Sequence, residues 1–143
     1  MSNISERLAD LITDTHKDVK TIAEEVGLPA SCFTFYLKGE RAPTVESLVK
    51  IADYFNCSTD YLLGLEEENN NLKFKPCPPF PERLEAIKNR YNYKTYQICE
   101  SAGISRSGYY SWKRGEHLPF TDNLVKLAKH LDCRVDYILG RES

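Results

Sequence analysis

Apolar residues recur with helical spacing along this chain, in two blocks of similar length. In the first block, apolar positions three or four residues apart predict helices over 4–15, 19–26, 29–38 and 44–55, and a short fifth helix at DYLLG. The second block predicts helices over 80–90, from Thr95, from about Ser105, over 121–131 and at VDYILG. Between the blocks, EEENNNLKFKPCPP breaks the periodicity and is typical of a linker. We therefore predict an all-α protein with two tandem five-helix domains, at 1–65 and 80–143, joined by a linker at 66–79.

The most informative stretch runs from Thr95 to Gly115, TYQICESAGISRSGYYSWKRG. Gly103 separates two short amphipathic segments, and glycine readily adopts the left-handed conformation that a sharp turn after a helix needs. Tyr109 and Trp112 form the apolar stripe of the second segment. This pattern predicts a helix-turn-helix whose second helix is shaped for the major groove of DNA.

The same stretch occurs earlier, at an offset of 76 residues. Without any gap, Ile22 aligns with Ile98, Gly27 with Gly103 and Tyr36 with Trp112. The register holds from ERL at residue 6 to DYLLG at residue 64, and roughly a third of the paired positions are identical. A fixed offset over such a length indicates a duplicated domain.

The outward positions of the two predicted recognition helices differ in chemistry. In the second repeat they carry hydrogen-bonding and cationic side chains, and we predict DNA contacts at Thr95, Ser105, Arg106, Ser107, Tyr110, Ser111, Lys113 and Arg114. The candidates in the first repeat are weaker: Ser31, Thr34, Lys38 and Arg41. Arginine is a specific partner of guanine, which makes Arg106 the best candidate for a base contact. Phe35 suits either a thymine methyl group or a protein interface.

Charge is distributed unevenly between the repeats. Residues 2–66 hold six Lys or Arg against eleven Asp or Glu, whereas residues 80–141 hold eleven against seven. A phosphate surface attracts the second repeat and repels the first. Acidic helix-turn-helix domains can still bind DNA through a local basic patch, so DNA binding by the first repeat stays open.

Each repeat resembles the five-helix DNA-binding domain of Cro and lambda-type repressors, the XRE family. The resemblance rests on ICESAGISRSGYYSWKRGEHLP with NLVKLAKHLDCRVDYILG, and on IAEEVGLPASCFTFYLKGERAP with SLVKIADYFNCSTDYLLG. It implies binding to specific duplex sequences, commonly by dimers at palindromic operators, to regulate transcription. It also implies that bases are contacted from the start and outward face of the third helix of each repeat. Where the family often has Gln, at the start of the second helix, this chain has Val19 and Thr95.

The predicted function is therefore a sequence-specific, double-stranded DNA-binding transcriptional regulator, a repressor, with the second repeat as its main DNA-binding domain. The alternative is an antitoxin-like or phage-encoded protein-interaction module whose first repeat mediates dimerisation or binds a partner. A homodimer and an intramolecular pseudo-dimer are both compatible with the duplication.

The linker decides how far apart the two domains can act. Fully extended, about 14 residues span about 45–50 Å, more than the ~34 Å between successive major-groove faces on one side of DNA. Alternatively, Leu72 and Phe74 pin the linker against a domain and shorten its reach.

Other classes of function find no support in the sequence. The five cysteines include no C-x-x-C motif, and no ligand-like spacing joins them to the three histidines, so we expect reduced structural thiols and no metal. We find no nucleophile–base set and no phosphate-binding glycine loop, and therefore expect neither an enzyme nor a cofactor. With no apolar run of membrane-spanning length and no signal peptide, we expect a cytoplasmic protein without membrane contact.

Overall fold

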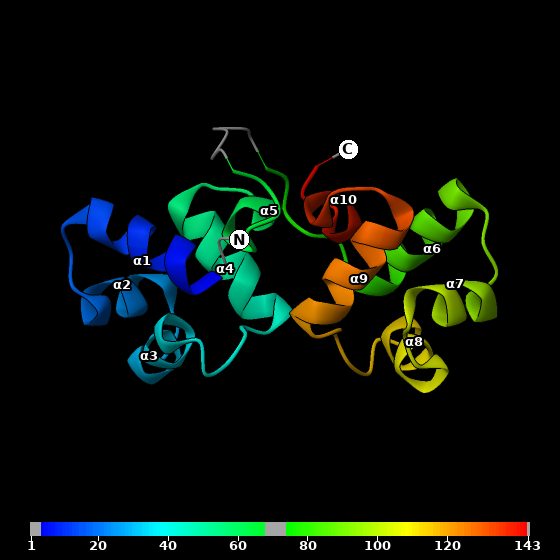
Figure 1. The fold of residues 1–143 in the computed structure, drawn as a ribbon, viewed down its shortest axis with the longest axis horizontal. Coiled ribbons are helices and arrows are strands. Elements are labelled where there is room, and N and C mark those ends of the chain that lie inside the picture. Colours follow the sequence, from blue (N-terminus) through cyan, green and yellow to red (C-terminus); the bar gives the residue numbers. More distant parts are fainter. Residues whose placement is uncertain (1–3, 68–73, 143) are drawn as a thin grey trace. The chain divides into compact units, whose positions relative to one another are not determined.

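The computed structural model describes residues 4–67 and 74–142, and these residues form two compact units of helices (Figure 1). The units comprise residues 1–73 and 74–143. Within the described residues all regular elements are helices, which confirms the predicted all-α fold with two tandem five-helix domains. The finer boundaries proposed above, at 65/66 and 79/80, stay a prediction.

The two units have the same order of helices. The first contains α1 (Ile4–Thr15), α2 (Val19–Val26), α3 (Ala30–Lys38), α4 (Val45–Phe55) and α5 (Thr59–Leu62). The second contains α6 (Phe80–Tyr91), α7 (Thr95–Ala102), α8 (Arg106–Lys113), α9 (Thr121–Leu131) and α10 (Val135–Leu139).

Each helix of the first unit contributes a fully buried residue to one core. These residues are Leu8, Ile22, Phe33, Leu48 and Leu62. The residues 76 positions later, Leu84, Ile98, Tyr109, Leu124 and Ile138, are buried in the second unit. Because small helices are stabilised mainly by burying one face, keeping the same five core positions keeps the same fold.

The helix ends show where local chemistry sets the boundaries. Asp18 caps α2, its Oδ1 accepting the Thr21 N–H at 2.8 Å. The predicted start of the third helix at Pro29 is wrong by one position. Pro29 has φ −61° and ψ 139°, an extended conformation outside the helix, and α3 begins at Ala30. Pro29 occupies the N-cap position without supplying a side-chain hydrogen bond.

Both units end in the same glycine-dependent turn. Gly64 and Gly140 have φ of 80° and 82°, a left-handed conformation in which a side chain would be strained. The turn lets the residue after each glycine donate its N–H back to an aspartate carbonyl, Leu65 to Asp60 at 2.8 Å and Arg141 to Asp136 at 2.9 Å.

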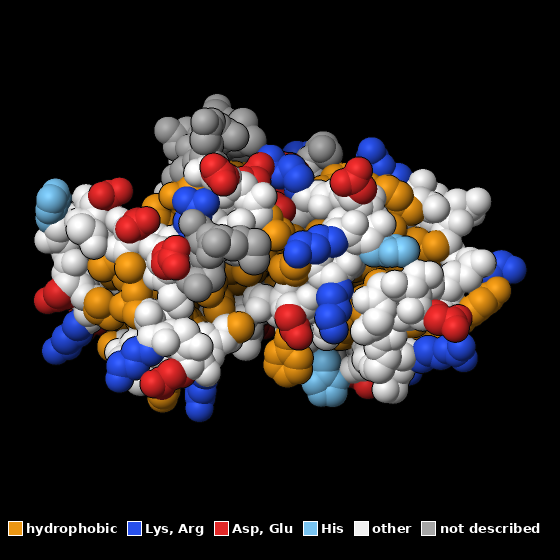
Figure 2. Space-filling model, viewed as in Figure 1, with side chains coloured by type: hydrophobic (Ala, Val, Ile, Leu, Met, Phe, Trp, Pro, Cys, Tyr) orange, Lys and Arg blue, Asp and Glu red, His pale blue; other side chains and the backbone are white. Residues whose placement is uncertain are grey.

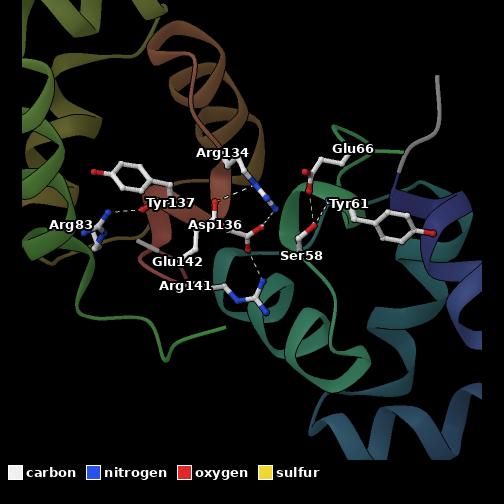
Figure 3. Close-up of polar contacts among 9 residues, drawn as sticks. All are labelled: Ser58, Tyr61, Glu66, Arg83, Arg134, Asp136, Tyr137, Arg141 and Glu142. Carbon is white, nitrogen blue, oxygen red and sulfur yellow. Dashed lines mark hydrogen bonds and ion pairs between the residues drawn. The ribbon is translucent and has the colours of Figure 1, made fainter. Parts of the chain in front are cut away.

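The polar groups around these turns differ between the units (Figure 3). In the first unit, the Ser58 hydroxyl donates to Glu66 Oε1 at 2.9 Å. In the second, Arg141 Nη1 lies 2.6 Å from Asp136 Oδ1, and both side chains are fully buried. Asp136 Oδ2 also lies 3.4 Å from Arg134 Nη2, so this buried carboxylate is held between two arginines.

The residues before α6 lie against the second unit. The Lys75 N–H donates to the Arg141 carbonyl at 2.8 Å, and the Arg141 guanidinium lies 4.2 Å from the centre of the Phe74 ring. These contacts favour the alternative in which Phe74 pins the linker. Leu72, the other residue of that hypothesis, lies outside the described residues, as does the rest of 68–73.

The repeats also differ at the N-terminus of their fourth helix, and this difference predicts opposite effects on stability. Thr44 caps α4 by accepting the Ser47 N–H at 3.2 Å, whereas Phe120 occupies the same position before α9 and makes no capping bond. Phe120 is 71% exposed.

Thr44→Ala should therefore lower the free energy of unfolding of the first unit by about 1 kcal/mol, and Phe120→Thr should raise that of the second by up to about 1 kcal/mol. Urea unfolding of the full chain measures both.

Thr44→Ser, which keeps the capping oxygen, is the control and should unfold almost as the unaltered chain does. A marked loss of stability in Phe120→Thr would contradict this interpretation, because it would mean that the exposed ring packs against the fold.

Candidate nucleic-acid interface

The turn between α7 and α8 has the geometry of a helix-turn-helix. Gly103 takes φ 72° and donates its N–H to the Cys99 carbonyl, and the Ile104 N–H donates to the same oxygen at 2.9 Å. Ile104 is buried, so the chain turns inward for one residue before Ser105 caps the next helix. The turn between α2 and α3 repeats this arrangement around Gly27, at φ 89°.

Aromatic packing holds one face of α8 against its unit. Tyr109 and Trp112 are buried, with ring centres 5.9 Å apart. The Trp112 ring meets the Phe80 ring of α6 edge-on at 6.3 Å, a favourable arrangement of aromatic quadrupoles. Trp112 and Tyr36, its counterpart in the first unit, are thus core residues.

With that face buried, the opposite face of α8 points away from the unit. Residues one turn apart share a helix face, and the exposed set comprises Arg106, Ser107, Tyr110, Lys113 and, just after the helix, Arg114. Figure 2 shows Lys and Arg side chains over α8 and, in the other unit, over α3. The structure therefore brings most of the predicted DNA-binding residues of the second repeat onto one exposed surface.

Two of the predicted contact serines also have structural roles. Ser105 is the N-cap of α8, and its Oγ accepts the Gly108 N–H at 3.1 Å. Gly108 leaves space for this cap, since a Cβ there would lie 2.8 Å from that oxygen. Ser111 is half-buried, and its Oγ lies 2.6 Å from His117 Nδ1. Thr95, the first residue of α7, is also half-buried.

The cations of this surface are not equally available. Arg114 Nε lies 2.8 Å from Glu116 Oε1, and this hydrogen bond and charge raise the pKa of Arg114 and lower the pKa of Glu116. A phosphate would have to compete with Glu116 for Arg114. Within the part of the chain that the structure describes, neither Arg106 nor Lys113 has an ion-pair partner.

The corresponding surface of the first unit is less suited to base contacts. Ser31, Thr34 and Lys38 are exposed, but Thr34 Oγ1 donates back to the Ala30 carbonyl at 3.3 Å. The Arg41 guanidinium lies 4.4 Å from the centre of the Phe35 ring, a cation–π contact that covers part of that ring.

Acidic side chains reduce the positive charge near α2. Lys17 Nζ lies 3.0 Å from Glu25 Oε1, and the Tyr54 hydroxyl donates to the same carboxylate. Hydrogen bonds from Tyr54 and then Lys17 hold the pKa of Glu25 below its usual value. Glu25 therefore stays ionised and partly neutralises Lys17.

The tyrosines before α7 have different environments. The Tyr93 and Tyr109 hydroxyls lie 2.8 Å apart, so Tyr93 belongs to the edge of the core and holds the loop before α7 against α8. Tyr96 is 48% exposed and stays a candidate for a phosphate contact. Burial, and then the Tyr93 hydrogen bond, raise the pKa of Tyr109 well above its ordinary value.

The loop after α8 carries exposed residues that sequence reasoning missed. Leu118 and Phe120 are 41% and 71% exposed, and His117 beside them is exposed as well. The sequence did offer one signal for this loop. Where the first repeat has Thr44, a residue that can cap a helix, the second repeat has the apolar Phe120.

Comparison with known proteins agrees with this geometry. A family model described as helix-turn-helix matches the chain twice, over residues 18–62 and 84–138. The chain belongs to this XRE-type helix-turn-helix family. Each matched segment holds one of the two helix-turn-helix elements described above.

Three curated relatives carry regulatory names. The chain is 38% identical over 74 residues to the cryptic phage CTXphi transcriptional repressor RstR of Vibrio cholerae, covering 50% of this chain and 66% of RstR. It is 36% identical over 59 residues to the uncharacterized HTH-type transcriptional regulator YobD of Bacillus subtilis, covering 41% of this chain and 53% of YobD. It is 31% identical over 58 residues to repressor protein C2 of Salmonella phage P22, covering 41% of this chain and 27% of the C2 protein.

The chain thus spans less than two thirds of the length of each of these relatives. No solved structure matches it significantly. Among the described residues, no helix has the length and hydrophobicity required to span a bilayer, and no group of three or more His, Cys, Asp or Glu side chains could hold a metal ion.

The buried tyrosine pair makes stability depend on high pH. Because the pKa of Tyr109 is raised on folding, its contribution is fully present below about pH 10, the unfolded value, and is lost as the pH rises above it. The free energy of unfolding should therefore fall above pH 10, and that of the Tyr109→Phe variant should fall less steeply. Chemical unfolding from pH 8 to 12 measures this. The control is Tyr110→Phe on the exposed face of α8; equal slopes in both variants would contradict the assignment.

Proposed function

We propose that this protein is a sequence-specific, double-stranded DNA-binding transcriptional regulator, with the second unit as its main DNA-binding domain. The observation that carries the proposal is the exposed face of α8, where Arg106, Ser107, Tyr110 and Lys113 lie together opposite buried Tyr109 and Trp112. Such a helix fits the major groove and presents hydrogen-bonding groups to it.

The position of each side chain along α8 suggests its role. Arg106 is the first residue of the helix, and residues at the N-terminus of a recognition helix contact base edges. Its guanidinium can donate two hydrogen bonds to guanine O6 and N7. Ser107 and Tyr110 extend the same face with hydroxyl groups. Lys113 and Arg114, at the other end of the helix, suit phosphates, which fix orientation rather than sequence.

The first unit is proposed to contribute less to DNA binding. Ala30 occupies the position of Arg106, and Thr34 occupies that of Tyr110. Lys38 and Arg41 can still neutralise phosphates. The partly covered Phe35 ring supports a second role for this unit, a contact with another protein domain or with a second copy of the chain. The names of RstR and the P22 protein support repression as the direction of regulation.

Loss of the arginine at the start of α8 tests the proposal. A preferred duplex is first selected from a random-sequence pool with the full chain. Arg106→Ala should then weaken binding by about 1–3 kcal/mol and relax the preference at one base pair, because a bidentate contact to a base edge is lost. Binding to single-base variants of the selected duplex, at fixed salt, measures both effects.

The control is Lys126→Ala, which removes an exposed cation of α9 outside this surface and should change affinity little. An equal loss on every duplex would make Arg106 a phosphate contact. No effect of Arg106→Ala at all would contradict the role of α8.

A further inference from the structure

A cleft of about 420 Å³ lies within the second unit, away from the face described above. The segment before α6 forms one wall, through Lys75, Pro76 and Pro78. Helix α6 contributes Arg83 and Arg90, and the end of α10 contributes Tyr137 with the residues that follow it. In Figure 1, α10 and α8 lie at opposite ends of the second unit. A duplex on α8 would therefore leave the cleft uncovered.

The lining of the cleft carries an excess of positive charge. Lys75, Arg83 and Arg90 line it with a single carboxylate, Glu142. Glu142 itself forms an ion pair with Arg134, at 3.2 Å. Three cations and one carboxylate around the same cleft favour an anion there.

Neutral groups hold both guanidinium groups in place. Arg83 Nε donates to the Ile138 carbonyl at 3.2 Å. Arg83 Nη2 donates to the Tyr137 carbonyl at 2.5 Å (Figure 3). Arg90 Nη1 donates to the Tyr137 hydroxyl at 3.1 Å. The guanidinium groups of Arg83 and Arg90 lie 5.1 and 4.8 Å from the centre of the Tyr137 ring. They are thus positioned without a carboxylate partner among the described residues, and arginine binds oxyanions through a planar set of donors.

The first unit shows which of these groups the fold requires. Arg7 and Tyr61 occupy the positions of Arg83 and Tyr137, and Arg7 lies 4.4 Å from the centre of the Tyr61 ring. The stacked arginine is therefore a shared structural feature. At the position of Arg90, however, the first unit has Asp14. Arg90 is therefore specific to the second unit.

We propose that this cleft binds a small oxyanion, the phosphate or carboxylate group of a metabolite-sized ligand, between Lys75 and Arg90. Its volume falls in the range of about 300–1,000 Å³ usual for small-molecule sites. The ligand would bridge the segment before α6 to the body of the unit. This site goes beyond the proposed DNA binding and does not depend on it.

The experiment titrates the full chain with inorganic phosphate, glycerol phosphate and acetate in chloride buffer without DNA. Chemical-shift changes at the Lys75 and Tyr137 amides and calorimetry report binding. We expect saturable binding of at least one anion, weakened at least tenfold in Arg90→Asp, which installs the side chain of the first unit. Lys75→Ala should weaken it several-fold and serves as a second variant if Arg90→Asp unfolds. Tighter binding of the phosphates indicates a phosphorylated ligand, and tighter binding of acetate a carboxylate.

Lys126→Asp is the matched control, with the same change of charge on an exposed position of the second unit outside the cleft. It should leave anion binding within twofold of the unaltered chain. An equal loss in Lys126→Asp would overturn the proposal, because the anion would then respond only to net charge. Absence of saturable binding of all three anions would overturn it too. So would displacement of bound phosphate by duplex DNA, which would assign the cleft to the DNA interface.

Discussion

The packing of Tyr109 and Trp112 in the core, with Trp112 against Phe80 of α6, is the constraint on which the second unit's surface depends. These two side chains place one face of α8 in the core, and the helical period then places Arg106, Tyr110 and Lys113 on the opposite face. Their burial supplies stability and orientation together, since aromatic residues bury large areas in defined geometry. In the first unit, Phe33 and Tyr36 do the same for α3.

The two repeats share these buried positions but differ in the side chains that they expose. The five buried positions that define each core are apolar or aromatic in both units, and both units end in a left-handed glycine turn. The exposed positions are under no such requirement. There, Ala30 corresponds to Arg106 and Asp14 to Arg90, and the net charge of the repeats has opposite sign. Each repeat therefore serves as an internal reference for the other, because a difference between them is a difference on a common fold.

Much of the fold followed from the sequence because burial imposes a period. Helices α1 and α2 lie where the apolar spacing places them. Gly103 has the left-handed conformation expected of a glycine in a tight turn between two amphipathic segments. The error at Pro29 is local, since proline suits both the N-cap and the first turn and only the backbone conformation decides between them.

The outward face of α8 was also predictable from the sequence. Which of its polar side chains already have hydrogen-bond or ion-pair partners was not. Ser105 serves the helix as its cap, and Arg114 pairs with Glu116. Contacts between residues distant in sequence, such as Tyr93 with Tyr109, leave no periodic signal at all. Sequence patterns indicate which side chains face outward, whereas the availability of each donor depends on neighbours that only the folded chain brings close.

The central claim, that α8 is the main DNA-binding helix, is tested most directly by the salt dependence of duplex binding. Three full chains are compared: the unaltered protein, Lys113→Ala with Arg114→Ala, and Lys38→Ala with Arg41→Ala. Each phosphate contact contributes about −0.9 to the slope of log affinity against log salt. We expect the α8 variant to lose up to about two such contacts and most of its affinity, while the α3 variant changes less. Equal changes in both variants, or a larger change in the α3 variant, would contradict it.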